Sequence, residues 1–103
     1  MQNEKIEKMI KLIFLFKVKD FINWKNNFDK DMTTILKAVE AKSIHIDRGL
    51  LDPNLVIIIV EFENLENAKN FSESEILKDR MQLTGFIDKP NILYAEEIEN
   101  LTL

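Results

Sequence analysis

Two segments of the chain, 9–18 and 51–62, are rich in apolar residues, which in the second segment are concentrated at 55–62. Side chains alternate between the two faces of a β-strand, so strands formed here would be apolar on both faces. In the second segment, the residues that point one way are Val56, Ile58, Val60 and Phe62, and those that point the other way are Leu55, Ile57 and Ile59. The pattern predicts two strands that need cover on both sides.

Apolar residues recur at helical spacing after each of these strands. Asp20 is a suitable N-cap for a first helix, and its apolar stripe consists of Trp24, Phe28, Met32, Ile35, Leu36 and Val39. Asn64 is a suitable N-cap for a second helix, which Gly85 should end. The polar residues around Ser74 interrupt this second helix, so we expect it to be bent or split there.

Two further strands complete the expected fold. The segment "SIHIDRGL", 43–50, leads through the turn residues "LDPN" back into segment 51–62, which predicts a hairpin. The segment after Pro90, 91–98, reads as a final strand. The order β-α-β-β-α-β predicts an α+β, ferredoxin-like domain, with a four-stranded antiparallel sheet and both helices on one face. We expect one domain, 1–103, with its core at about 9–98.

The other face of this sheet would be bare and apolar. Ile13 and Leu15 on one strand and Ile57 and Ile59 on another would form an exposed patch of a kind that is rare on soluble monomers. A second copy of the chain is the simplest cover for it. The sequence therefore predicts a homodimer that is joined through the open sheet face.

Composition and charge exclude several classes of function. A net charge of -4 argues against a nucleic-acid partner, because such proteins concentrate Lys and Arg. The absence of cysteine removes disulfides and thiolate metal sites, which fits the cytoplasm. Glu4 and Glu7 are unsuited to an export signal, and the apolar run that follows is far shorter than the roughly 20 residues of a membrane span. We expect no membrane partner.

His45 and Arg48 are the candidate catalytic residues. His45 is the sole histidine, and histidine exchanges protons readily near neutral pH, so it is a candidate general base. The structural alternative is a hydrogen bond across the hairpin to Glu61, if the loop has three residues. Arg48 is a candidate stabiliser of a carboxylate or phenolate, and its alternative is an ion pair with Asp47, Asp52 or a carboxylate of the partner chain. With one histidine and no glycine-rich loop, we expect no metal and no organic cofactor.

Aromatic and apolar residues are the candidate walls of a small-molecule pocket. They are Trp24, Phe28, Tyr94 and Met81. Aromatic walls with a few polar groups are typical of such pockets, but the same residues can simply fill the core. Both interpretations stay open at this stage.

Between about Met9 and Ile98 the chain resembles the dimeric α+β-barrel superfamily, and within it small proteins related to antibiotic-biosynthesis monooxygenases. The resemblance rests on "WKNNFD" at 24–29, "DPN" at the hairpin, and a set of single positions: Ala68, Phe71, Ser74, Leu77, Met81 and Gly85. It implies a small-molecule-binding homodimer, in some members a cofactor-independent oxygenase, cyclase or isomerase. The heme-degrading members use a histidine on the second helix, and segment 65–85 has none. The alternative function is a non-catalytic structural or regulatory dimer with a filled interior.

Overall fold

The structure is a computed structural model that describes residues 9–83 and 89–103, without the side chains of 81–83. The elements, in chain order, are β1 (Ile10–Lys17), α1 (Phe21–Phe28), α2 (Met32–Ala38), β2 (Ser43–Arg48), β3 (Leu55–Phe62), α3 (Leu65–Ser72), α4 (Glu75–Leu83) and β4 (Asn91–Glu96). All four expected strands are present, within a few residues of their expected ends.

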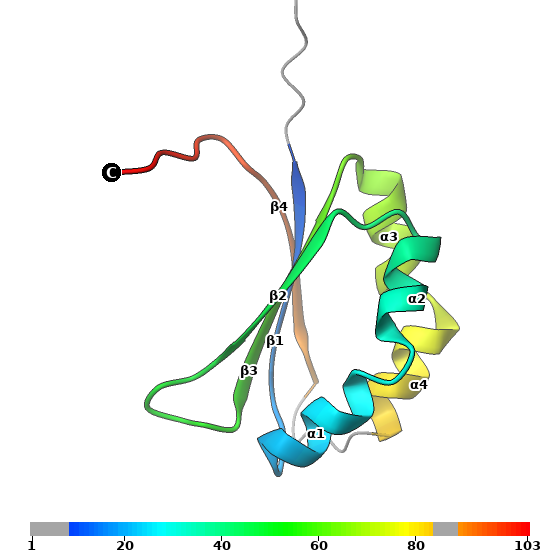
Figure 1. The fold of residues 1–103 in the computed structure, drawn as a ribbon, viewed down its shortest axis with the longest axis vertical. Helices are drawn as coiled ribbons and strands as arrows, with labels where there is room; N and C mark the ends of the chain where they lie inside the picture. The colour runs from blue at the N-terminus through cyan, green and yellow to red at the C-terminus, as the bar shows by residue number, and fades with distance from the viewer. Residues whose placement is uncertain (1–8, 84–88) are drawn as a thin grey trace, which may run out of the picture.

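The strands form one antiparallel sheet in the order β2-β3-β1-β4. The four helices lie together on one side of it, and the β2–β3 hairpin and the end of the chain extend on the other side (Figure 1). This arrangement confirms the predicted ferredoxin-like α+β fold.

Side-chain caps fix where three of the helices begin. Asp20 Oδ1 accepts a hydrogen bond from the Ile22 backbone N–H at 3.2 Å, and Asn64 Oδ1 accepts one from Asn67 at 2.8 Å. Ser74 Oγ accepts one from Leu77 at 3.2 Å, which starts α4 directly after α3 ends. These bonds satisfy donors that a helix N-terminus leaves free. The predicted split at Ser74 is confirmed, whereas Gly85, the predicted stop, lies outside the described residues.

The prediction of one continuous first helix was wrong. α1 ends at Phe28 and α2 begins at Met32, with Asp31 in the left-handed conformation at φ 59° between them. Aspartate is one of the few residues that tolerate this conformation. Because Phe28 and Met32 stay one helical turn apart in sequence, the apolar stripe runs across the break and conceals it.

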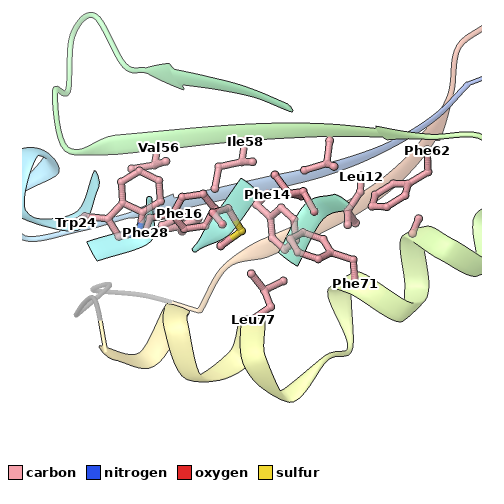
Figure 2. Packing of buried hydrophobic residues seen from close by; sticks show 14 of the residues in the cluster. Leu12, Phe14, Phe16, Trp24, Phe28, Val56, Ile58, Phe62, Phe71 and Leu77 are labelled. Atoms are coloured by element: carbon pink, nitrogen blue, oxygen red, sulfur yellow. The ribbon is translucent and has the colours of Figure 1, made fainter. Parts of the chain in front are cut away.

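The core lies between the helices and one face of the sheet. Its buried side chains from the sheet are Leu12, Phe14, Phe16, Val56, Ile58, Val60 and Phe62. Trp24, Phe28, Phe71 and Leu77 cover them from the helices, and Figure 2 shows Trp24 and Phe28 near Val56 and Phe71 nearer to Phe62. The helices therefore cover those apolar residues of β1 and β3 that point toward them.

The opposite face of the sheet carries the other half of that pattern. The register places His45, Ile59, Ile13 and Leu93 in one row across all four strands. Asp47, Ile57, Leu15 and Asn91 form the next row. Leu93 is 54% exposed, and no element of the described chain packs against these rows. This surface is called the open face below.

Candidate functional site

Four aromatic rings gather where α1 meets the sheet. Trp24 stacks on Phe28 with ring centroids 4.8 Å apart and planes inclined by 23°. Phe16 meets Trp24 edge-on at 5.6 Å, and Phe21 lies 5.7 Å from it. Such pairs contribute beyond the area that they bury. These rings are called the Trp24 cluster below, and they bring together two of the expected pocket residues, Trp24 and Phe28.

Trp24 carries an unused polar group into this apolar setting. Its side chain is 0% exposed, and its indole Nε1 has no hydrogen-bond partner within the described structure. A buried donor without an acceptor costs about 1–3 kcal/mol, and native structures contain few of them. The N–H is therefore an available donor inside the Trp24 cluster.

Arg48 borders the Trp24 cluster from the sheet. It lies opposite Val56 in the register, so its side chain is on the helix side, with its guanidinium carbon 4.5 Å from the centroid of the Phe21 ring. Arg48 Nε donates to the Pro53 carbonyl oxygen at 2.6 Å. A cation over a ring face is an attractive arrangement. The guanidinium thus stands at the rim of the aromatic group.

The ion pair expected between Arg48 and a nearby aspartate is not formed in the structure as described. Asp52 instead pairs with Lys17, at 3.0 Å between Oδ2 and Nζ. The hydrogen bond from Lys17 and one from the Asn54 backbone N–H lower the pKa of Asp52 below its ordinary value. Arg48 therefore keeps its charge free of a carboxylate partner among the described residues.

His45 lies on the other side of the sheet from Arg48. It is opposite Ile59, on the open face, and is exposed to solvent. The expected hydrogen bond to Glu61 is wrong, because Glu61 lies opposite Ser43 and accepts from Ser43 Oγ at 2.6 Å. His45 and Arg48 are three residues apart, and an odd spacing on a strand sends side chains to opposite faces. The two candidate catalytic residues therefore do not meet within one protomer.

Tyr94 and Met81 are not part of the Trp24 cluster as described. Tyr94 lies opposite Leu12 on β1, is 42% exposed, and its Oη lies 2.6 Å from Ser72 Oγ on α3. Leu12 and Phe16 are about 13 Å apart along the strand, which separates Tyr94 from Trp24. Met81 belongs to α4, but its side chain lies outside the described part of the structure.

Arg80 is an organising residue that the sequence reasoning missed. From α4 its Nη1 donates to the backbone carbonyl oxygens of Asn27, Phe28 and Lys30, and its Nη2 lies 3.8 Å from Asp31 Oδ2. The carbonyl groups at a helix C-terminus lack partners within the helix, so a guanidinium fork suits them. Arg80 thereby holds the end of α1, and with it Phe28, against α4.

The described surface includes the following two grooves. One of about 210 Å³ lies between α2 and β2, and its lining residues are Thr33, Leu36, Lys37, Ala41, Lys42, Ser43 and Ile44. The other, of about 230 Å³, is lined by Leu15, Phe16, Lys17, Leu55, Lys89 and Asn91. Neither is lined by Trp24, Phe28 or Tyr94.

The described residues form neither a metal site nor a membrane-spanning helix. Across residues 9–83 and 89–103, the structure groups no three His, Cys, Asp or Glu residues in a way that could hold a metal ion. In the same residues no helix is both long enough and apolar enough to cross a bilayer.

Solved structures with the same architecture include a candidate antibiotic biosynthesis monooxygenase from Bordetella bronchiseptica, with a TM-score of 0.75 and 15% identity over 89% of this chain and 99% of that one. The chain shares the fold of that protein. A monooxygenase from Streptomyces coelicolor in complex with the ligand nanaomycin D matches with a TM-score of 0.70 and 9% identity, over 94% of each chain. A dimeric protein of unknown function from Bacteroides fragilis matches with a TM-score of 0.65 and 17% identity, over 86% of this chain and 96% of that one. No protein-family model and no curated protein matches the sequence.

Proposed function

We propose that the protein is a homodimer, joined through the open face, in which each protomer binds a small aromatic compound beside Trp24. The open face supports the first part. Ile13, Ile57 and Ile59 form a continuous apolar centre on it, in register across adjacent strands, and Leu93 extends it onto β4. Two such faces stack at about 10 Å in sheet-on-sheet packing, which would remove this surface from water.

Polar pairs border the apolar centre at both ends of the sheet. Lys11 Nζ lies 3.3 Å from Glu97 Oε1 at one end, and Lys17 pairs with Asp52 at the other. An apolar centre with a polar rim is the usual composition of an interface between protein chains. The dimeric ferredoxin-like protein from Bacteroides fragilis gives a precedent in the same fold.

The buried and unpartnered Nε1 of Trp24 is the observation that carries the ligand proposal. A carbonyl, phenol or carboxylate oxygen of a bound molecule would satisfy this donor, and the aromatic rings around it favour a flat ligand. Arg48, at the rim of the Trp24 cluster, would favour a weakly acidic one. The monooxygenase from Streptomyces coelicolor is solved with a ligand in the same fold.

In its enzymatic form, the proposal is a cofactor-independent oxygenase, cyclase or isomerase acting on such a compound. Arg48 would stabilise negative charge that develops on a substrate beside Phe21. His45 points away from the Trp24 cluster onto the open face, which the partner covers in this dimer, so it would not be the general base for that compound. Of the two candidate catalytic residues, Arg48 is thus the one that could act on a compound at the Trp24 cluster.

A non-catalytic dimer with a filled interior is the second candidate, and one observation favours it. Trp24 and Phe28 are 0% and 1% exposed and stack directly on each other, which leaves no space between the two rings. A ligand beside Trp24 would have to displace one of the neighbouring rings. The two candidates therefore differ in whether the Trp24 cluster opens.

Fluorescence of Trp24, the sole tryptophan, distinguishes the two candidates. Titration with a panel of phenols and aromatic carboxylates should change the emission saturably if the Trp24 cluster binds such a compound. Arg48→Ala should then weaken binding by about 1.5–3 kcal/mol, through loss of a charge-assisted hydrogen bond. Lys69→Ala, on the exposed side of α3, is the matched control for loss of a positive charge. An emission that no compound changes would favour the filled dimer.

A further inference from the structure

The segment 98–103 extends from the sheet as an apolar arm. It follows β4 and runs on the side away from the helices (Figure 1). Ile98, Leu101 and Leu103 are 75%, 67% and 112% exposed. Its starting point is fixed, because the Glu97 backbone N–H donates to the Met9 carbonyl oxygen at 2.9 Å and the Glu97 carboxylate pairs with Lys11. A firmly anchored segment thus presents three large apolar side chains to solvent.

The opposite edge of the sheet offers a groove of matching chemistry. β2 is the terminal strand on that side, and the groove of about 210 Å³ lies between it and α2. Leu36, Ala41 and Ile44 contribute its apolar lining, and Lys37 adds positive charge, whereas Lys42 already pairs with Glu63 at 3.7 Å. Glu99 lies between the apolar residues of segment 98–103. The arm and the groove are therefore complementary in both apolar character and charge.

The backbone of β2 can also accept a strand beside this groove. The Gly49 N–H donates to the Leu55 carbonyl oxygen, and bonded pairs alternate along an antiparallel ladder. The backbone groups of Ile44 and Ile46 consequently point away from β3, toward the free edge. An exposed edge of this kind is a ready template for strand addition by another chain.

We propose that segment 98–103 of each protomer docks in the α2–β2 groove of its partner, an inference that rests on the proposed homodimer. A two-fold axis parallel to the strands, between two stacked open faces, brings β4 of one protomer over β2 of the other. The same axis places equivalent ends of the two sheets next to each other. The register puts Glu96 and Ser43 at the same end of the sheet. The arm of one protomer then starts close to the partner's groove.

The length of the arm is sufficient for this path. Six extended residues span up to about 20 Å, and stacked sheets are about 10 Å apart. The arm can therefore cross the interface and still lie along part of the partner's β2. Its leucines would then enter the groove, and Glu99 would approach Lys37.

Disulfide trapping between single-cysteine chains tests this contact, because the natural chain has no cysteine. Thr33→Cys, on the groove, and Leu101→Cys, on a tagged arm, are prepared separately, mixed to exchange subunits and oxidised mildly. A link between them can form only between chains. Asn26→Cys, exposed on α1, replaces Thr33→Cys in the control mixture. We expect the Thr33→Cys mixture to form the mixed dimer at least about tenfold faster than the control.

The outcomes separate this inference from the dimer itself. Equal trapping rates in both mixtures, with light scattering still at the dimer mass, would overturn the docking and leave the homodimer standing. A monomeric mass for the natural chain would overturn both. Deletion of segment 98–103 gives an independent measure. It should raise the concentration at which half of the dimer dissociates by about tenfold or more, and an unchanged concentration would contradict the docking.

Discussion

His45 lies directly opposite Ile59 in the ladder between β2 and β3, and so it belongs to the open face. Ile13 and Leu93 continue the same row to the far edge of the sheet. In the proposed dimer this row is the centre of the interface. The residue that looked most suitable for proton transfer is therefore placed where a partner protomer would cover it, and the Trp24 cluster lies beneath the opposite face.

Ile59→Asp should dissociate the dimer, because the substitution buries an unpaired charge between the two sheets. The molar mass from light scattering should fall to that of one chain, or the chain should unfold, as circular dichroism would reveal. Asn70→Asp introduces the same charge on the exposed side of α3 and should leave the dimer intact. An Ile59→Asp protein that stays dimeric at micromolar concentration would show that the open face is not the interface.

Phe28→Ala should lower the free energy of unfolding by about 3–5 kcal/mol, because it leaves a cavity beside Trp24. Urea titration followed by circular dichroism measures this change. Asn26→Ala, on the exposed side of the same helix, should change stability by less than about 0.5 kcal/mol. A small effect of Phe28→Ala would mean that the Trp24 cluster adds little to the core.

Tyr94→Phe and Ser72→Ala should each destabilise the protein by about 1 kcal/mol, because each removes the hydrogen bond between α3 and β4. The double variant should lose less than the sum of the two, with a coupling of about 0.5–1.5 kcal/mol. Chemical denaturation of the natural chain, the two single variants and the double variant gives the four free energies of this double-mutant cycle. Strict additivity would mean that the two hydroxyl groups do not interact in solution.

Arg80→Met should lower the free energy of unfolding by about 1–2 kcal/mol, since the carbonyl groups at the end of α1 lose their charged donor. Arg80→Lys should recover only part of the loss, because an ammonium group lacks the planar fork of the guanidinium. Thermal unfolding of both variants measures the difference. Equal stability of Arg80→Met and the natural chain would contradict this capping role.

The sequence predicted the strands of the sheet well because they are strongly apolar and the alternation of side chains fixes which face each residue occupies. Pairing His45 with Glu61 instead of Ile59 shifts β2 by two residues, which keeps every side chain on its face. The apolar pattern therefore could not reject the wrong register, which the loop alone decides. A Cβ at Gly49 would overlap the Asp52 carbonyl oxygen, so the loop folds tightly around this glycine.

The candidate site was less predictable, for reasons that differ from residue to residue. The opposite faces of His45 and Arg48 follow from their odd spacing and could have been recognised in the sequence. The break at Asp31 was hidden by the continuous apolar stripe from Phe28 to Met32. The role of Arg80 depends on how α4 approaches the end of α1, which is a tertiary contact with no local signature.

Light scattering of the natural chain at micromolar concentration tests the central claim most directly. The homodimer predicts a molar mass of twice the 12.1 kDa chain, maintained on dilution through the low micromolar range. That result would mean that a second copy is available to cover the apolar rows of the open face. A stable, folded species with the mass of one chain would contradict the dimer.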